Sequence, residues 1–184
     1  MYERGRDYYR EFRNALRQTH WQTGDIGTFE AALTPLLIRV KKNKRESYKQ
    51  AGEAYVALWK RRDADYFPIP RTTIDIAGLT IRVNPELGMS FSHDKMALKL
   101  WLNAPKPTRG YRQAIQYMCE VGRKGLWEDS WTMTVWDVRR EETLPPVRIQ
   151  KDIDMILEGD AIKFQHLWKR LGAGVVAALE DDDE

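Results

Sequence analysis

The stretch "NPELGMSFSHDKMALKLW" (residues 84–101) decides the fold class, because it contains the predicted central strand of a β-sheet. Its second half leads into "MALKLWLN" (96–103), which is mostly apolar, as expected of a central β-strand covered on both faces. The "GMSFS" segment before it is expected to be a short continuation of the same sheet. Two charged residues stand out: Glu86, just past a proline, and Lys99, inside the strand. A lysine in a central strand is costly if it is buried without a partner, so this strand needs an explanation.

Both charged residues have an ordinary explanation as well as a functional one. Lys99 either faces solvent on a half-exposed strand or lies beside a partner in a site. Glu86 is either a turn residue, because Pro-Glu-x-Gly is an ordinary turn, or a carboxylate held in place for chemistry. The sequence alone leaves both alternatives open.

The segments upstream of residue 64 are expected to be helical. Apolar residues recur at spacings of three and four over residues 5–19 and 45–62, which predicts two amphipathic helices. Between them a further helix is predicted from about residue 28. Pro35 either kinks that helix or occupies the first turn of one capped by Thr34.

After residue 64 the pattern changes from helices to strands. Residues 65–72 contain two prolines and are predicted to be an extended linker. Residues 72–83 are predicted to form one or two strands with a turn at Ala77 and Gly78. The remaining predicted elements are a loop at 103–110, a helix at 110–124, a strand at 130–141, and helical stretches at 152–159 and 160–180.

This order predicts an α+β fold with a mixed β-sheet core, built as strand-strand-strand-helix-strand and flanked by N-terminal helices and a C-terminal helical segment. The predicted organisation is an N-terminal helical region (1–63), an α/β core (64–143), C-terminal helices packed on the core (144–179) and an acidic tail (180–184).

The composition is that of an ordinary globular protein with one main core. The chain has 184 residues, of which 42% are hydrophobic and 31% charged, so disorder is not expected. No window approaches the roughly 18 consecutive apolar residues of a membrane span, and the N-terminus lacks the apolar core of a signal peptide. The single cysteine, Cys119, excludes an internal disulfide and a zinc site built on cysteines. We therefore expect a cytoplasmic protein.

Positive charge is concentrated in the first third of the chain, although the net charge is only +3. Five of the seven residues at 39–45 are basic, whereas the chain ends in five consecutive acids. This distribution favours a surface that binds a polyanion without reading sequence. The candidate nucleic-acid contacts in this run are Lys41, Lys42, Lys44 and Arg45. The alternative is a solvated loop between two helices.

A second candidate for phosphate contact lies in "TVWDVRREE" (134–142). Arg139 and Arg140 follow a strand and are placed to contact phosphates, with Asp137 as a metal ligand or as an arginine partner. The alternative is an exposed strand end with local ion pairs.

Residues 45–139 resemble the PD-(D/E)XK, or restriction-endonuclease-like, nucleases in their order of helix, three strands, helix and strand. That family holds magnesium with an acid at the end of the second core strand and with the acid of an (Asp or Glu)-x-Lys triplet on the third. The resemblance implies that Glu86 is the first acid and Lys99 the lysine that helps to place the attacking water. The second acid is missing, because Ala97 occupies its position, and Glu53 or Asp94 is the substitute ligand that the resemblance would require.

A further match lies on the predicted helix after the lysine strand. Gln113 and Tyr117 form a Gln-x-x-x-Tyr pair, which resembles the RecB-like branch of these nucleases. Four residues apart, the two side chains share one helix face, from which they would support a phosphate or orient the lysine.

Two functions follow as hypotheses. The first is a nucleic-acid-binding protein with a nuclease-like core, either a Mg²⁺-dependent nuclease acting on DNA or RNA or a relative that binds without cutting. The second is a non-catalytic adaptor that docks on a protein partner. The three histidines have no metal-ligand spacing, and the sequence has neither a P-loop nor a serine-hydrolase elbow.

Overall fold

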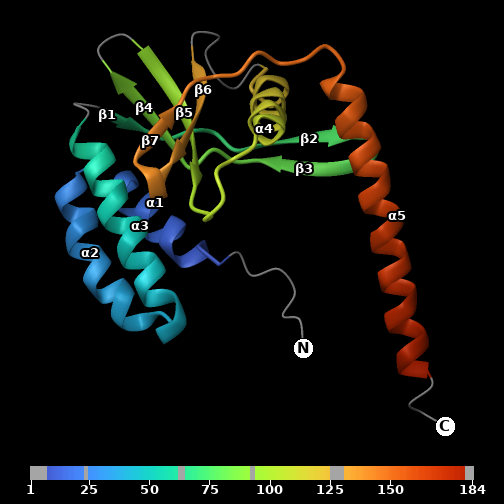
Figure 1. Cartoon of the computed structure of the whole chain (residues 1–184), viewed down its shortest axis with the longest axis horizontal. Helices are drawn as coiled ribbons and strands as arrows, with labels where there is room; N and C mark the ends of the chain where they lie inside the picture. Colours follow the sequence, from blue (N-terminus) through green and yellow to red (C-terminus); the bar gives the residue numbers. More distant parts are fainter. Residues whose placement is uncertain (1–7, 23–24, 62–64, 92–93, 125–130, 181–184) are drawn as a thin grey trace.

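The computed structural model describes residues 8–22, 25–61, 65–91, 94–124 and 131–180, with side chains masked at 91 and 172–180. It has the predicted α+β architecture: three N-terminal helices, a mixed five-stranded sheet, a separate hairpin, an internal helix and a long C-terminal helix (Figure 1). The predictions at residues 1–7 and in the acidic tail 181–184 lie outside the described residues.

The three N-terminal helices are α1 (Arg10–Gln22), α2 (Ile26–Arg39) and α3 (Lys42–Lys60). Helix α2 begins two residues before the predicted position, because the Asp25 side chain caps its first N–H groups. Pro35 lies inside α2. The helices bury an aromatic core, whose fully enclosed members include Phe12, Phe29, Tyr48 and Tyr55.

The main sheet has the strand order β1-β4-β5-β6-β7. Its strands are β1 (Asp65–Phe67), β4 (Leu87–Phe91), β5 (Asp94–Trp101), β6 (Thr132–Asp137) and β7 (Glu142–Leu144). Among these five described strands, β5 and β6 pair in parallel and the other neighbouring strands pair antiparallel. The two short outer strands were not predicted, since three residues give little periodicity, and β1 falls in the segment interpreted as a linker. The strand predicted over 130–141 ends at Asp137, where a short 3₁₀ helix, η1 (Val138–Arg140), begins.

The predicted turn at Ala77 and Gly78 joins β2 (Thr72–Ile76) to β3 (Leu79–Val83). Both turn residues have positive φ, 50° and 76°, as tight hairpins require. This hairpin forms a two-stranded sheet of its own rather than strands of the main sheet.

The two faces of β5 separate the molecule into two packing layers. Leu98 and Leu100 belong to the core shared with α1, α2 and α3, whereas Ala97 belongs to a second core with the hairpin and α4 (Arg109–Gly122). Alternation along the strand places Lys99 on the same face as Ala97.

The C-terminal helix α5 (Ile153–Glu180) is one continuous helix where two helical stretches were predicted. Ile153 and Ala161 are buried against the rest of the fold, and Gln165 donates a hydrogen bond to the Ala77 carbonyl of the hairpin. Figure 1 shows that α5 then extends away from the body. Its later turns expose large apolar side chains: Phe164, Leu167, Trp168 and Leu171.

Candidate functional site

Glu86 and Lys99 are brought together by the pairing of β4 with β5. Leu87 pairs with Leu98, and the Glu86 N–H donates to the Leu98 carbonyl at 2.8 Å. Continuing that antiparallel register places Glu86 opposite Lys99, where cross-strand side chains share one face. The Lys99 Nζ lies 2.7 Å from Glu86 Oε1. The two charged residues that stand out in the sequence therefore form one ion pair.

The Glu86 carboxylate is buried, with 4% of its side chain exposed, and both of its oxygens are occupied. Oε1 also lies 3.2 Å from Nε of Arg13 on α1, and Oε2 accepts a hydrogen bond from the Leu100 N–H at 3.0 Å. A buried carboxylate is stable only when it is paired in this way. Lys99 additionally donates to the Asn84 carbonyl at 3.4 Å. Glu86 thus holds two cations from different elements.

Further cations surround this ion pair. The pKa of Arg17, one turn after Arg13 on α1, is lowered first by burial and then by the positive charge of Arg71, whereas the charge of Glu86 raises it. Arg17 Nε donates to the Arg13 carbonyl at 3.3 Å, and Arg17 lines one hollow together with Arg71. We call Arg13, Arg17, Arg71 and Lys99 the cationic cluster. Lys99 and Arg13 contact the Glu86 carboxylate, and Arg17 and Arg71 continue the cluster toward the end of α1.

Helix α4 forms the other wall of the site. Burial, followed by the charge of Glu86, raises the pKa of Tyr111 on the first turn of α4. A small cavity of about 70 Å³ lies between Lys99 and the α4 side chains Ile115, Met118 and Cys119. Burial raises the pKa of the Cys119 thiol to about 12, so it is a packing residue rather than a nucleophile. The site is therefore bounded by α1 on one side and α4 on the other.

Of the three carboxylates named as magnesium ligands, Glu86 lies beside Lys99, whereas Asp94 and Glu53 do not join it in a metal-binding group. Asp94 is five residues away on β5, roughly 16 Å along the strand and on the opposite face. Glu53 is exposed on α3, and Ala97 is 1% exposed at the position of the missing acid. Among the residues that the structure describes, no group of three or more His, Cys, Asp and Glu side chains is arranged to hold a metal.

The donor set around Glu86 also does not fit Mg²⁺. Magnesium needs oxygen ligands in octahedral geometry, usually including one or two carboxylates. Glu86 offers one carboxylate, whose oxygens already contact Lys99, Arg13 and a backbone N–H. A divalent cation there would lie beside two positive side chains, which opposes its binding. Magnesium stays a prediction from the family resemblance.

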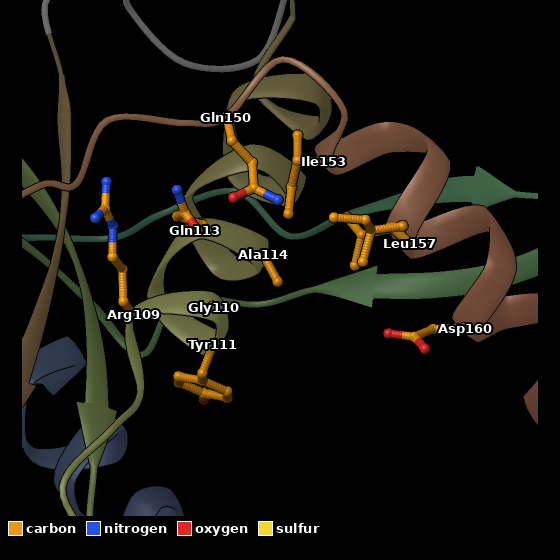
Figure 2. Close-up of a pocket in the computed structure, with 10 residues that line it drawn as sticks. Arg109, Gly110, Tyr111, Gln113, Ala114, Gln150, Ile153, Leu157 and Asp160 are labelled. Atoms are coloured by element: carbon orange, nitrogen blue, oxygen red, sulfur yellow. The ribbon is translucent and has the colours of Figure 1, made fainter.

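Gln113 and Tyr117 lie on a different side of α4 from the residues that line the cavity with Lys99. The Gln113 Nε2 donates to the Arg148 carbonyl at 2.8 Å. Figure 2 shows Gln113 with Gln150 in the hollow of about 590 Å³ between α4 and α5. Tyr117, half-buried, follows one turn later on the same face. The amide is therefore committed to the segment before α5 rather than to the lysine.

The "TVWDVRREE" segment contains a local ion pair, which is the alternative to phosphate contact that the sequence offered for this strand end. Asp137 is fully buried, and its Oδ2 accepts from Nη1 of Arg140 at 2.8 Å. Arg140 also donates to the Ala104 carbonyl at 2.6 Å. Arg139 is exposed to solvent.

Two of the four basic residues proposed in the 39–45 run have structural partners. Lys44 pairs with Glu11 at 3.2 Å and lies over the rings of Tyr8 and Tyr48. Arg45 donates to the carbonyls of Ile38 and Val40 at the end of α2. Lys41 and Lys42 are exposed at the start of α3.

Sequence reasoning missed Arg13, Arg17, Arg71 and Tyr111. The spacing of Arg13 and Arg17, four residues apart on a predicted helix, indicates one helix face but not which element lies opposite. Nothing in the sequence links Arg71 to that face. The missing information was the position of α1 at the end of the sheet where β4 begins.

No family model, curated protein or solved structure matches the chain. Within the described part of the chain, no helix combines the length and apolarity needed to cross a membrane. The functional argument therefore depends on the geometry of the site.

Proposed function

We propose that this protein binds DNA or RNA through the cationic cluster, on a core related to the PD-(D/E)XK nucleases that has lost the ability to cut. The observation that carries the proposal is the arrangement at Glu86, where Lys99 and Arg13 share its buried carboxylate. Arg17 follows Arg13 on α1 and lines one hollow with Arg71. The cations exceed the central acid, so the site attracts an anion. A chain of phosphates is the ligand that repeats negative charge over such a surface.

The order of elements supports the nuclease-like part of this proposal. From α3 onward the chain runs β1, β4, β5, α4 and β6, with the hairpin inserted between β1 and β4. This is the family order of helix, three strands, helix and strand. Glu86 differs from the family pattern because it precedes β4 rather than ending a strand.

In the bound state the cations contact phosphate oxygens, and Glu86 keeps Lys99 and Arg13 in position. Such contacts read charge rather than sequence. If all four cations bind phosphates, the logarithm of the binding constant falls with the logarithm of salt concentration with a slope of about −3 to −4. Cutting would need metal ligands that the described carboxylates do not provide together.

The test is binding and cleavage in parallel. Single- and double-stranded DNA and RNA are incubated with wild type, Lys99→Gln, Arg13→Gln and the control Lys163→Gln, an exposed lysine on α5. We expect binding that Lys99→Gln and Arg13→Gln each weaken about tenfold at about 50 mM salt, with Lys163→Gln unchanged. Failure of the wild type to bind any of these ligands contradicts the proposal. Cleavage that requires Mg²⁺ and is lost in Lys99→Gln contradicts the part of the proposal that says the core no longer cuts.

A second candidate function is self-association through α5. The stripe that buries Ile153 and Ala161 continues into the later turns as Phe164, Trp168 and Leu171, which are exposed and spaced by three and four residues. That spacing is self-complementary between two helices, so the occupant we propose is α5 of a second copy. Light scattering over a range of concentrations should give a dimer that Phe164→Ser and Leu171→Ser dissociate; a monomer at every concentration would exclude it.

A further inference from the structure

Trp21 is the large apolar side chain with the greatest exposed fraction in the described part of the chain, at 73%. It lies in the last turn of α1, directly after the buried His20. A single exposed apolar residue is common on protein surfaces and by itself has no functional meaning. The surroundings of Trp21 are what distinguish it.

Trp21 lines an open hollow of about 400 Å³ at the end of α1. The other lining residues are two arginines, Arg17 and Arg71, and three amides, Asn14, Gln18 and Gln22. No carboxylate lines the hollow among the described residues. An aromatic ring beside cations and amide groups matches a nucleotide, which has a flat base, a phosphate and hydrogen-bonding edges.

The hollow is continuous with the cationic cluster, because Arg17 and Arg71 belong to both. Arg13, Arg17 and Trp21 follow one another at intervals of four residues on α1, which forms a row roughly 12 Å long on one helix face. Arg13 and Arg17 are half-buried, whereas Trp21 is exposed at the end of the row. Arg13 connects the row to Glu86 and Lys99.

We infer that the ligand of this surface is single-stranded nucleic acid, with phosphates on the cationic cluster and a base stacked on Trp21. The inference rests on the proposed function and specifies its substrate. In a duplex, neighbouring base pairs cover the faces of each base, so an exposed indole finds a free face only on an unpaired nucleotide. The phosphate contacts alone would not distinguish single strands from duplexes.

The experiment compares a labelled oligothymidine of about 16 nucleotides with a duplex of the same length by fluorescence anisotropy. Trp21→Ala removes the stacking surface, and Trp21→Phe retains an aromatic ring. The matched control is Ile38→Ala, because Ile38 is a large apolar side chain on α2 that is exposed to a similar extent, at 71%, and lines neither the hollow nor the cationic cluster. Thermal unfolding of each variant shows whether it is folded, which we expect since neither Trp21 nor Ile38 is in the core.

We expect the wild type to bind the single strand more tightly than the duplex. Trp21→Ala should weaken single-strand binding about tenfold, the equivalent of one stacked base, and leave duplex binding unchanged. Trp21→Phe should retain most of the affinity, and Ile38→Ala should match wild type. If wild type binds nucleic acid but Trp21→Ala has no effect, the stacking inference is wrong while the proposed function stands. If wild type binds neither ligand, both are wrong.

Discussion

Two regions of this molecule carry concentrated positive charge, and they differ in how the charge is assembled. The run at 39–45 is contiguous in sequence and joins α2 to α3. The cationic cluster takes Arg13 and Arg17 from α1, Arg71 from the segment before β2 and Lys99 from β5. The first is obvious in the sequence, and the second exists only in the folded chain.

The contacts of the two regions show why density of charge along a chain is a poor guide to a binding site. Arg45 binds carbonyls at the end of α2, and Lys44 pairs with Glu11, so part of the run stabilises helix packing. In the cationic cluster, Arg13 and Lys99 instead share one buried carboxylate. Their charge exceeds what Glu86 can neutralise, and this excess is what an anionic ligand would neutralise.

The largest effect should come from removing the acid that holds the cluster together. Glu86→Gln leaves Lys99 and Arg13 without their shared carboxylate, so we expect the free energy of unfolding to fall by about 3 kcal/mol. The amide oxygen of the glutamine can still accept hydrogen bonds from Lys99 and Arg13 and keep them in position. Nucleic acid should therefore bind as tightly as before or more tightly, since one negative charge is lost. Urea unfolding and anisotropy measure the two quantities. Lost binding in a folded Glu86→Gln variant would contradict a purely cationic site.

Removing two cations of the cluster should greatly weaken the binding of nucleic acid. The double variant Arg13→Ala, Lys99→Ala should bind single-stranded DNA about 100-fold more weakly at about 50 mM salt, because each phosphate contact contributes about tenfold there. Circular dichroism is the control for folding. An affinity within threefold of wild type would exclude the cluster as the binding surface.

Acidification should lower the free energy of unfolding through His20, which is buried on α1. His20 is buried against Trp59 and its Nε2 lies 2.8 Å from the Tyr55 hydroxyl; burial lowers its pKa to about 4 from an ordinary value of 6.5. Below pH 6.5 the unfolded chain binds a proton that the folded chain does not, so stability falls as pH falls toward 4. From about pH 7.5 to about pH 5 the loss from this group is about 2 kcal/mol. Urea unfolding of wild type and His20→Gln at both pH values should show that loss only in wild type; an equal loss in both would contradict it.

The smallest effect should come from the contiguous run. Lys41→Ala with Lys42→Ala removes the two exposed lysines at the start of α3, and we expect single-strand affinity to change by about twofold, through long-range charge alone. Anisotropy at the same salt concentration measures it. A loss as large as that of Arg13→Ala, Lys99→Ala would locate binding on the run instead.

The fold was largely predictable because the spacing of apolar residues differs between helices and strands. The helical and strand patterns gave the α+β class, the central strand containing Lys99 and the helix that became α4. Short edge strands and the separate hairpin sheet were missed, because pairing partners are set by contacts between distant segments.

The candidate site was predictable only in part. Lys99 was identified because a lysine in an apolar strand needs a partner, and Glu86 because it matches the first acid of the family pattern. The structure pairs the two. The partners of Gln113 and Lys44 were not predictable, since each depends on a segment at least 30 residues away in sequence. The place of Arg71 beside Arg17 was not predictable for the same reason.

The measurement that tests the central claim most directly is the salt dependence of single-strand binding for wild type and the two double variants. We predict that the log–log slope becomes shallower by about one to two in Arg13→Ala, Lys99→Ala and stays close to the wild-type slope in Lys41→Ala, Lys42→Ala. Such a result would show that the phosphates contact the cluster. An unchanged slope in the first variant, with a shallower slope in the second, would contradict the account.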